Sequence, residues 1–323
     1  MKKWLLILLS VFTACGGKGG QQAVNDWFQP NEKFKVLCTT GFLADLVAQI
    51  GGERIDVLSL IAPGLDPHTY QLVKGDSEKL TFAHRVFYVG LGLEHGASLR
   101  AWLEDHTQAV GVGQQLFFRQ PELFLHHDGQ LDPHIWMDVS LWRRLIPFIV
   151  DELSTLDPEH AKKYAVSGKQ LSKQLGELHD ELYKQLQAIP EEKRYLITSH
   201  DAFNYFAKSY LAIPTEQKSG KWRERFAAPE GLAPDGQLSV SDIQLILRHI
   251  QEKRIAVVFP ESNLNRDSLF KIISAALEMK IPLRMSSKPL YGDSLGAPGT
   301  LGETYQKMMR FNATTIVEEI NAS

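Results

Sequence analysis

The feature of this sequence that most constrains its fold is a long apolar repeat near the middle of the chain. Its members recur at steps of three and four residues and are Leu171, Leu175, Leu178, Leu182, Leu186 and Ile189. This spacing places them on one face of an α-helix, which Asp157 and Pro158 can begin and Pro190 can end. At about 1.5 Å per residue, a helix over 157–190 would run the height of a domain and could join two lobes. The alternative is one core helix within a single larger domain.

Short apolar runs alternate with amphipathic stretches on both sides of this repeat. Before it, "FKVLCTT", "IDVLSLI" and "RVFYVG" are typical of strands, and "FLADLVAQIG" and "SEKLTFAH" are typical of helices. After it, "RYLITS" and "RIAVVFP" are typical of strands, and "SVSDIQLILRHIQEK" and "SLFKIISAALEM" of helices. The sequence therefore favours an α/β protein with two lobes, 34–156 and 191–323, connected by a linking helix at 157–190.

Composition limits the class of protein. The chain has 323 residues, of which 44% are hydrophobic and 23% charged, so it can bury a sizeable core. Its formal net charge is -3, and it contains no long basic run or basic patch interleaved with aromatic residues. These features argue against binding to nucleic acid.

The N-terminal residues indicate an export signal. Lys2 and Lys3 precede an apolar run that is too short to span a bilayer, and this run ends at Cys15. The pattern resembles the bacterial lipoprotein signal, which implies a signal peptide over 1–14 and lipidation of Cys15. An ordinary secretory signal is the alternative. Residues 15–33 begin with "CGGKGGQQ", which predicts a flexible tether. The second cysteine, Cys38, lies in an apolar run and is expected to be buried.

The tripeptide Asp-Pro-His occurs twice, ending at His68 and at His134. Proline restricts both its own backbone and that of the residue before it, so each histidine is presented from a stiff turn. Asp66 and Asp132 could each accept a hydrogen bond from the ring nitrogen that does not face a metal. Either aspartate could instead cap a helix or close a turn.

Three further candidates follow predicted strands or lie in loops of the second half. His200 follows "RYLITS", Glu261 follows "RIAVVFP", and Asp293 lies in "KPLYGDSLG". Because ligand sites of open α/β sheets gather at strand ends, a cleft between the lobes could bring these residues to the two Asp-Pro-His motifs.

Five motifs, in order, carry a resemblance to a known family. "GLDPHTY", "DPHIWMD", "TSHDAFNYFA", "VVFPES" and "LYGDSLG" resemble the motifs of the metal-binding solute-binding lipoproteins of manganese, zinc and iron ABC importers, also called cluster A substrate-binding proteins. The resemblance covers the chain from about residue 34 onward. It implies two α/β lobes with small parallel sheets, joined by one long rigid helix, with a metal site between the lobes.

The resemblance also implies the residues of that site. The metal ligands would be His68 and His134 from the first lobe and His200 and Asp293 from the second, with Glu261 nearby as a supporting residue. Three imidazoles and one carboxylate suit Zn, Mn or Fe as divalent ions, whereas Ca and Mg prefer a cage of oxygen ligands. The implied partners are a membrane permease with a cytoplasmic ATPase, to which a lipid-anchored monomer on the periplasmic or extracytoplasmic face would deliver the metal ion.

Two other functions use the same residues. A zinc hydrolase would bind its metal through His68, His134 and His200 and use Glu261 as general base. The sequence contains no H-E-x-x-H or related signature, and we therefore do not expect an enzyme. A surface adhesin with a structural metal is the second alternative.

Two segments lie outside these motifs. His126 and His127 could form an auxiliary metal-binding loop or simply a solvated one. Residues 215–234 are rich in Gly, Pro and charge, which predicts a surface loop.

Overall fold

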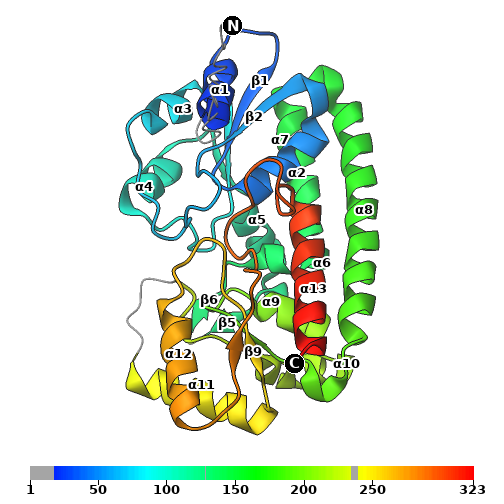
Figure 1. Cartoon of the computed structure of the whole chain (residues 1–323). Coiled ribbons are helices and arrows are strands. Elements are labelled where there is room, and N and C mark those ends of the chain that lie inside the picture. The colour runs from blue at the N-terminus through cyan, green and yellow to red at the C-terminus, as the bar shows by residue number, and fades with distance from the viewer. Residues whose placement is uncertain (1–17, 128, 234–238) are drawn as a thin grey trace, which may run out of the picture.

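The computed structural model describes residues 18–127, 129–233 and 239–323 (Figure 1). Two α/β lobes lie one above the other in the view of Figure 1, and the long helix α8 (Ala161–Gln187) runs beside both of them. The predicted α/β class with two lobes and a linking helix is confirmed. Within the described ranges, no helix combines the length and the apolar character needed to cross a membrane.

The first lobe is built on one parallel sheet with the strand order β2-β1-β3-β4. The inner strand β1 is almost fully buried, as expected where helices cover both faces of a parallel sheet. The strands are β1 (Phe34–Cys38), β2 (Ile55–Ser59), β3 (Arg85–Tyr88) and β4 (Ala109–Gly111). The helices are α1 (Lys18–Trp27), α2 (Gly41–Gly51), α3 (Asp76–Phe82), α4 (Ala97–Asp105), α5 (Val112–Arg119), α6 (Val139–Trp142) and α7 (Ile146–Leu156).

The second lobe contains two short parallel pairs of strands, β7 with β8 and β9 with β10. A backbone hydrogen bond from Phe259 to Ile197 brings the two pairs together. The strands are β7 (Leu196–Ile197), β8 (Phe226–Ala227), β9 (Val257–Val258) and β10 (Arg284–Met285). The helices are α9 (Asn204–Phe206), α10 (Pro214–Ser219), α11 (Val240–Lys253), α12 (Asp267–Glu278) and α13 (Tyr305–Asn321). A separate antiparallel hairpin consists of β5 (His126–His127) and β6 (Gln130–Leu131).

Helix α8 is shorter than the predicted span of 157–190. Asp157 has a non-helical backbone, as expected before a proline, and a 3-10 turn at Pro158–His160 precedes the α-helix. The Asp157 carboxylate accepts a hydrogen bond of 2.8 Å from the Tyr164 hydroxyl, which fixes this turn to the helix. The repeated leucines of the helix are buried, as the spacing predicts.

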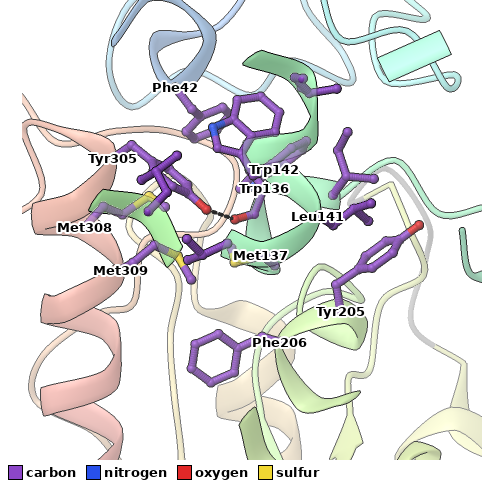
Figure 2. Close-up of a cluster of buried hydrophobic side chains, with 14 of the residues drawn as sticks. Phe42, Trp136, Met137, Leu141, Trp142, Tyr205, Phe206, Tyr305, Met308 and Met309 are labelled. Atoms are coloured by element: carbon purple, nitrogen blue, oxygen red, sulfur yellow. Dashed lines mark hydrogen bonds between the residues drawn. The ribbon is translucent and has the colours of Figure 1, made fainter. Parts of the chain in front are cut away.

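One hydrophobic cluster extends through both lobes along α8. It includes side chains of the first sheet, α2, α8 and α13, and continues to Phe206 and Tyr210 of the second lobe. Figure 2 shows its centre, where Phe42 stacks on Trp136 with ring centroids 4.8 Å apart. The Tyr305 hydroxyl, at the start of α13, donates a hydrogen bond of 2.7 Å to the Trp136 carbonyl (Figure 2). The last helix of the chain therefore packs into the core of the first lobe.

The predicted flexible tether at 15–33 is wrong for its second part. Residues Lys18–Trp27 form α1, and Trp27 is buried. The Trp27 indole donates a hydrogen bond of 3.0 Å to the carbonyl of Asp56, and its ring packs edge-on against Phe28 and Phe82. The Gly and Gln content suggested a tether, but burial of Trp27 anchors this segment to the sheet.

The predicted surface loop at 215–234 is also wrong for most of its length. It contains the end of α10, a 3-10 helix over Lys221–Arg225 and strand β8, and it buries Trp222. Arg225 is buried too, and its guanidinium contacts Glu216 at 2.7 Å and donates to the Glu191 carbonyl at 2.6 Å. The buried charge of Arg225 is thus neutralised inside the fold by Glu216 and by its contact with Glu191.

Truncating Leu178, which is 1% exposed on α8, tests the importance of the shared core. Leu178→Ala should lower the free energy of unfolding by about 2–5 kcal/mol, because it leaves a cavity between the packed helices. Urea denaturation of the metal-free protein measures the change. Val166→Ala on the same helix is the control, since Val166 is 67% exposed and its truncation should change stability by no more than about 0.5 kcal/mol. Equal effects of both substitutions would contradict a core that runs along α8.

Candidate metal centre

His68 lies in the loop that follows β2, and a local turn fixes its position. Asp66 accepts a hydrogen bond of 2.9 Å from the His68 backbone N–H and another of 2.9 Å from the Thr69 hydroxyl. Asp66 therefore closes the turn, one of the roles that the sequence left open, and it holds His68 through the backbone N–H rather than through the ring. The His68 side chain is buried and directs Nε2 towards the second lobe.

His134 begins a 3-10 turn, and Asp132 holds both its backbone and its ring. Oδ1 of Asp132 accepts from the His134 backbone N–H at 3.0 Å and lies 2.7 Å from Nδ1 of the ring. With Nδ1 donating to this carboxylate, Nε2 of the neutral ring carries its lone pair towards the centre of the site. Asp132 is fully buried, and its other oxygen accepts a hydrogen bond of 3.0 Å from the Asn204 amide.

Two residues of the second lobe support the His134 loop, and the sequence did not assign them a role. They are Asn204, which reaches Asp132 as described, and Tyr205, which donates a hydrogen bond of 3.0 Å to the Asp132 carbonyl. The Tyr205 hydroxyl also accepts from the Leu125 backbone N–H at 2.9 Å. Both residues follow His200 within the motif "SHDAFNYFA", which was the available sign of their importance.

His200 follows β7 and is held by Glu261, which follows β9. Oε1 of Glu261 accepts hydrogen bonds from the backbone N–H groups of Ser199 and His200, at 3.0 and 2.9 Å. Oε2 of the same carboxylate lies 2.8 Å from Nδ1 of the His200 ring. Both side chains are buried, so the carboxylate fixes the direction in which His200 Nε2 points.

Asp293 lies in the loop after β10, and this loop is held by the first lobe. The Trp136 indole donates a hydrogen bond of 2.9 Å to the Gly292 carbonyl. On the other side of Asp293, the Gly64 backbone N–H donates to the Ser294 hydroxyl at 2.7 Å. Trp136 and Gly64 belong to the first lobe, so Asp293 is positioned by contacts across the boundary between the lobes.

These elements bring His68, His134, His200 and Asp293 into one buried cluster. Their ligand atoms all lie within 4.8 Å of one another. The Nε2 atoms of His68 and His134 are 3.2 Å apart, and Nε2 of His200 lies 2.9 Å from Oδ2 of Asp293. A tetrahedral ion with bonds of about 2.0–2.1 Å would separate its ligands by roughly 3.3 Å, which these distances approach.

The chemistry of these four side chains favours the binding of a cation. Three ring nitrogens and a carboxylate face the same small space, and the carboxylate oxygens of Asp293 have no hydrogen-bond partner of good geometry among the described residues. A buried carboxylate requires compensation by a positive charge. The arrangement therefore fits a metal ion with nitrogen and oxygen ligands.

Electrostatics assign a protonation state to the metal-free cluster. Burial lowers the pKa of His68 well below its ordinary value, because it outweighs the attraction of Asp293. Burial acts in the same direction on His200, but attraction to Asp293 and Glu261 prevails and holds the pKa of His200 well above its ordinary value. Burial alone would raise the pKa of Asp293, yet the histidines, His200 first, hold it well below the usual range. These directions favour a charged His200 beside an ionised Asp293 in the metal-free cluster.

The remaining sequence candidates lie apart from this cluster. His126 and His127 form β5 of the exposed hairpin, where Nδ1 of His127 lies 3.1 Å from Oδ2 of Asp201. Neither histidine belongs to the four-residue cluster. Cys15 and the segment over 1–14 lie outside the described residues.

Comparison with known proteins gives consistent matches. Residues 36–319 match the family described as zinc-uptake complex component A, periplasmic. The metal-binding protein YtgA of Chlamydia pneumoniae is 38% identical over 310 residues, which cover 96% of this chain and 92% of that protein. The manganese-binding lipoprotein MntA of Bacillus subtilis is 30% identical over 322 residues, covering 97% of each chain.

The fold has a close counterpart among solved structures. The crystal structure of Fe(III)-bound YtgA from Chlamydia trachomatis is 35% identical in sequence and superimposes with a TM-score of 0.84. The superposition covers 89% of this chain and 98% of that chain. The likeness therefore extends over both lobes and the linking helix.

Removing the charge of Glu261 tests the electrostatics of the cluster. Glu261→Gln should lower the pKa of His200 in the metal-free protein, because it removes one of the two anions that stabilise the charged ring. An NMR titration of the histidine side chains, with chelator present, measures the change. Glu278→Gln, an exposed site on α12, serves as the control and should leave this pKa unchanged. A pKa of His200 that is the same in all three proteins would contradict the assignment.

Proposed function

Because this chain belongs to the zinc-uptake complex component A family, we propose that it captures a divalent transition metal ion outside the cytoplasm and delivers it to a membrane permease. The family consists of substrate-binding components of ABC importers, and a permease driven by a cytoplasmic ATPase is therefore the partner. The metal ion is the transported substrate.

The observation that carries this proposal is the buried cluster of His68, His134, His200 and Asp293. Two ligands come from the lobe at 34–156 and two from the lobe at 191–323, so the ion would bind where the lobes meet. Each imidazole except that of His68 has a carboxylate at its Nδ1 atom, at 2.7 Å for His134 and 2.8 Å for His200. Such carboxylates fix the tautomer and raise the basicity of a metal-binding ring.

The ligand chemistry narrows the substrate to Zn, Mn or Fe. Imidazole and carboxylate bind all three of these ions, and the cluster contains no thiolate that would select Cu(I). Ca and Mg are disfavoured, since nitrogen atoms make up most of the set. The relatives bind the same three elements, since the family is described by zinc uptake and MntA by manganese binding, while the YtgA structure holds iron in its trivalent form.

Capture involves the exchange of a proton for a metal ion. In the metal-free protein a proton on His200 neutralises Asp293, and the incoming cation takes over this role once the proton leaves. Glu261 and Asp132 keep the rings of His200 and His134 oriented during the exchange. Release to the permease then requires the ligands of the two lobes to separate, because neither lobe alone supplies the full set.

We extend the proposal to the attachment of the protein. Cys15 would carry the lipid that anchors the chain at the periplasmic or extracytoplasmic face of a membrane, in keeping with the lipoprotein name of MntA. The protein would act as a monomer, because one chain provides all four ligands.

The geometry does not favour a zinc hydrolase. A general base must reach a water molecule on the open side of the metal. Glu261 instead lies behind His200, with one oxygen bonded to two backbone N–H groups and the other against Nδ1. Asp293 is available as the fourth ligand, where a hydrolase would keep an open position. We therefore propose that the protein carries the metal ion and does not use it for catalysis.

Substitution of His200 tests the ligand set. His200→Ala should weaken the binding of Zn²⁺ and Mn²⁺ by more than tenfold, because one of four metal bonds is lost. Competition with a chelating indicator measures the affinity of the chain expressed from residue 18, where α1 begins. His106→Ala, which removes an exposed histidine stacked on Trp102, is the control. Unchanged affinity in His200→Ala would remove His200 from the set, and an ion that chelators cannot exchange would favour the adhesin.

Metal binding should also release protons. His200 is protonated at neutral pH in the metal-free protein, so Zn²⁺ should displace about one proton, and affinity should rise with pH up to the raised pKa of His200. Calorimetric titration at pH 7 in two buffers of different ionisation enthalpy measures this release. Absence of proton release would contradict the charged state assigned to His200.

A further inference from the structure

Gly292 lies directly before Asp293, and its Cα atom faces the carboxylate of Glu261. A Cβ atom built on Gly292 would lie 2.2 Å from Oε2 of Glu261 and 3.2 Å from its Cδ. Real Cβ atoms essentially never approach another heavy atom to less than 3.0 Å. Any side chain at position 292 must therefore displace the Glu261 carboxylate or the loop that carries Asp293.

The backbone conformation does not explain this glycine. Gly292 is absent from the glycines with positive φ, so an alanine could adopt the same backbone. A Cβ atom would also keep an ordinary contact of 3.6 Å with Cε1 of His200. The obstacle to a side chain is therefore the carboxylate that contacts His200.

Hydrogen bonds hold both neighbours of this contact in place. Backbone hydrogen bonds of 2.8 Å from Leu290 to Pro260 and from Ser262 to Leu290 pair the two segments on either side of the contact. Oε1 of Glu261 is already held by two backbone N–H groups. On its far side, Gly292 is tied to the first lobe by the bond from Trp136, whose indole stacks on Phe42 (Figure 2).

We propose that Gly292 is a positioning residue of the metal centre, whose missing side chain allows Glu261 to contact Nδ1 of His200. A side chain at this position would turn the carboxylate away from the ring, and Nε2 of His200 would lose its fixed direction towards Asp293. The inference deepens the proposed function and rests on it, because it concerns the orientation of a proposed metal ligand. It makes position 292 a determinant of metal affinity although the residue has no side chain to contact the ion.

A double-mutant cycle tests this link between Gly292 and Glu261. Gly292→Ala should weaken Zn²⁺ binding by about 10–100-fold, the range typical of residues that orient a metal ligand. Glu261→Ala should weaken binding similarly, and Gly292→Ala added to it should cost less than about twofold more, because the clash is gone. Gly231→Ala is the matched control: Gly231 also lies in the second lobe, lacks a positive φ and has open space around its Cα. Losses that multiply in the double variant, or wild-type affinity in Gly292→Ala, would overturn the proposal.

A second measurement needs no metal and separates this inference from the proposed function. In the chelated wild-type protein, NMR of ¹⁵N-labelled histidine should show the His200 Nδ1 resonance shifted by the Glu261 carboxylate that lies 2.8 Å away. Gly292→Ala should remove this signature, and Gly231→Ala should retain it. If wild-type protein binds no metal but the signature behaves in this way, the proposed function fails while the positioning role stands. If Gly292→Ala keeps the signature, the positioning role fails. Thermal unfolding of each variant shows whether it is folded.

Discussion

The metal centre depends above all on one buried negative charge, that of Asp293. A carboxylate without access to water is tolerated only beside a positive charge. Here the three imidazoles face Asp293 and can either carry a proton or bind a metal ion. Carboxylates behind two of the rings, Asp132 and Glu261, favour a positive centre further. The result is a site that is electrostatically incomplete unless it holds a proton or a metal ion.

The support of each ligand is divided between the lobes in different ways. His200 is held by Glu261 of its own lobe, whereas the Asp132 carboxylate that orients His134 is itself held by Asn204 from the opposite lobe. The Asp293 loop is tied to Trp136 and so to the stacked aromatic pair in the core of the first lobe. Packing in the hydrophobic core and geometry of the metal centre are therefore coupled through a few hydrogen bonds.

Local patterns predicted the elements of the fold well where periodicity was strong, as in the buried leucines of α8 and the first sheet. They failed at α1, because its glycines indicated a tether although Trp27 is buried against the sheet. They also failed for the segment around Arg225, whose burial depends on Glu216 and Glu191. The three histidines of the cluster were candidates because each follows a predicted strand or a stiff turn, and Asp293 because it lies in a predicted loop, while the family resemblance fixed the set. Sequence patterns could not reveal the hydrogen bond from Trp136 to the Gly292 carbonyl, because the two residues lie 156 positions apart in the chain.

The position of α13 shows that order along the chain and membership of a core do not coincide in this protein. This helix follows the second lobe in sequence, yet its side chains belong to the cluster shared by α2 and α8, and Tyr305 is bonded to Trp136. The two halves are consequently not interchangeable modules. A chimera that joined the first lobe of this chain to the second half of a relative would have to repack a foreign α13 against the native α8, and recombination within the family is constrained accordingly.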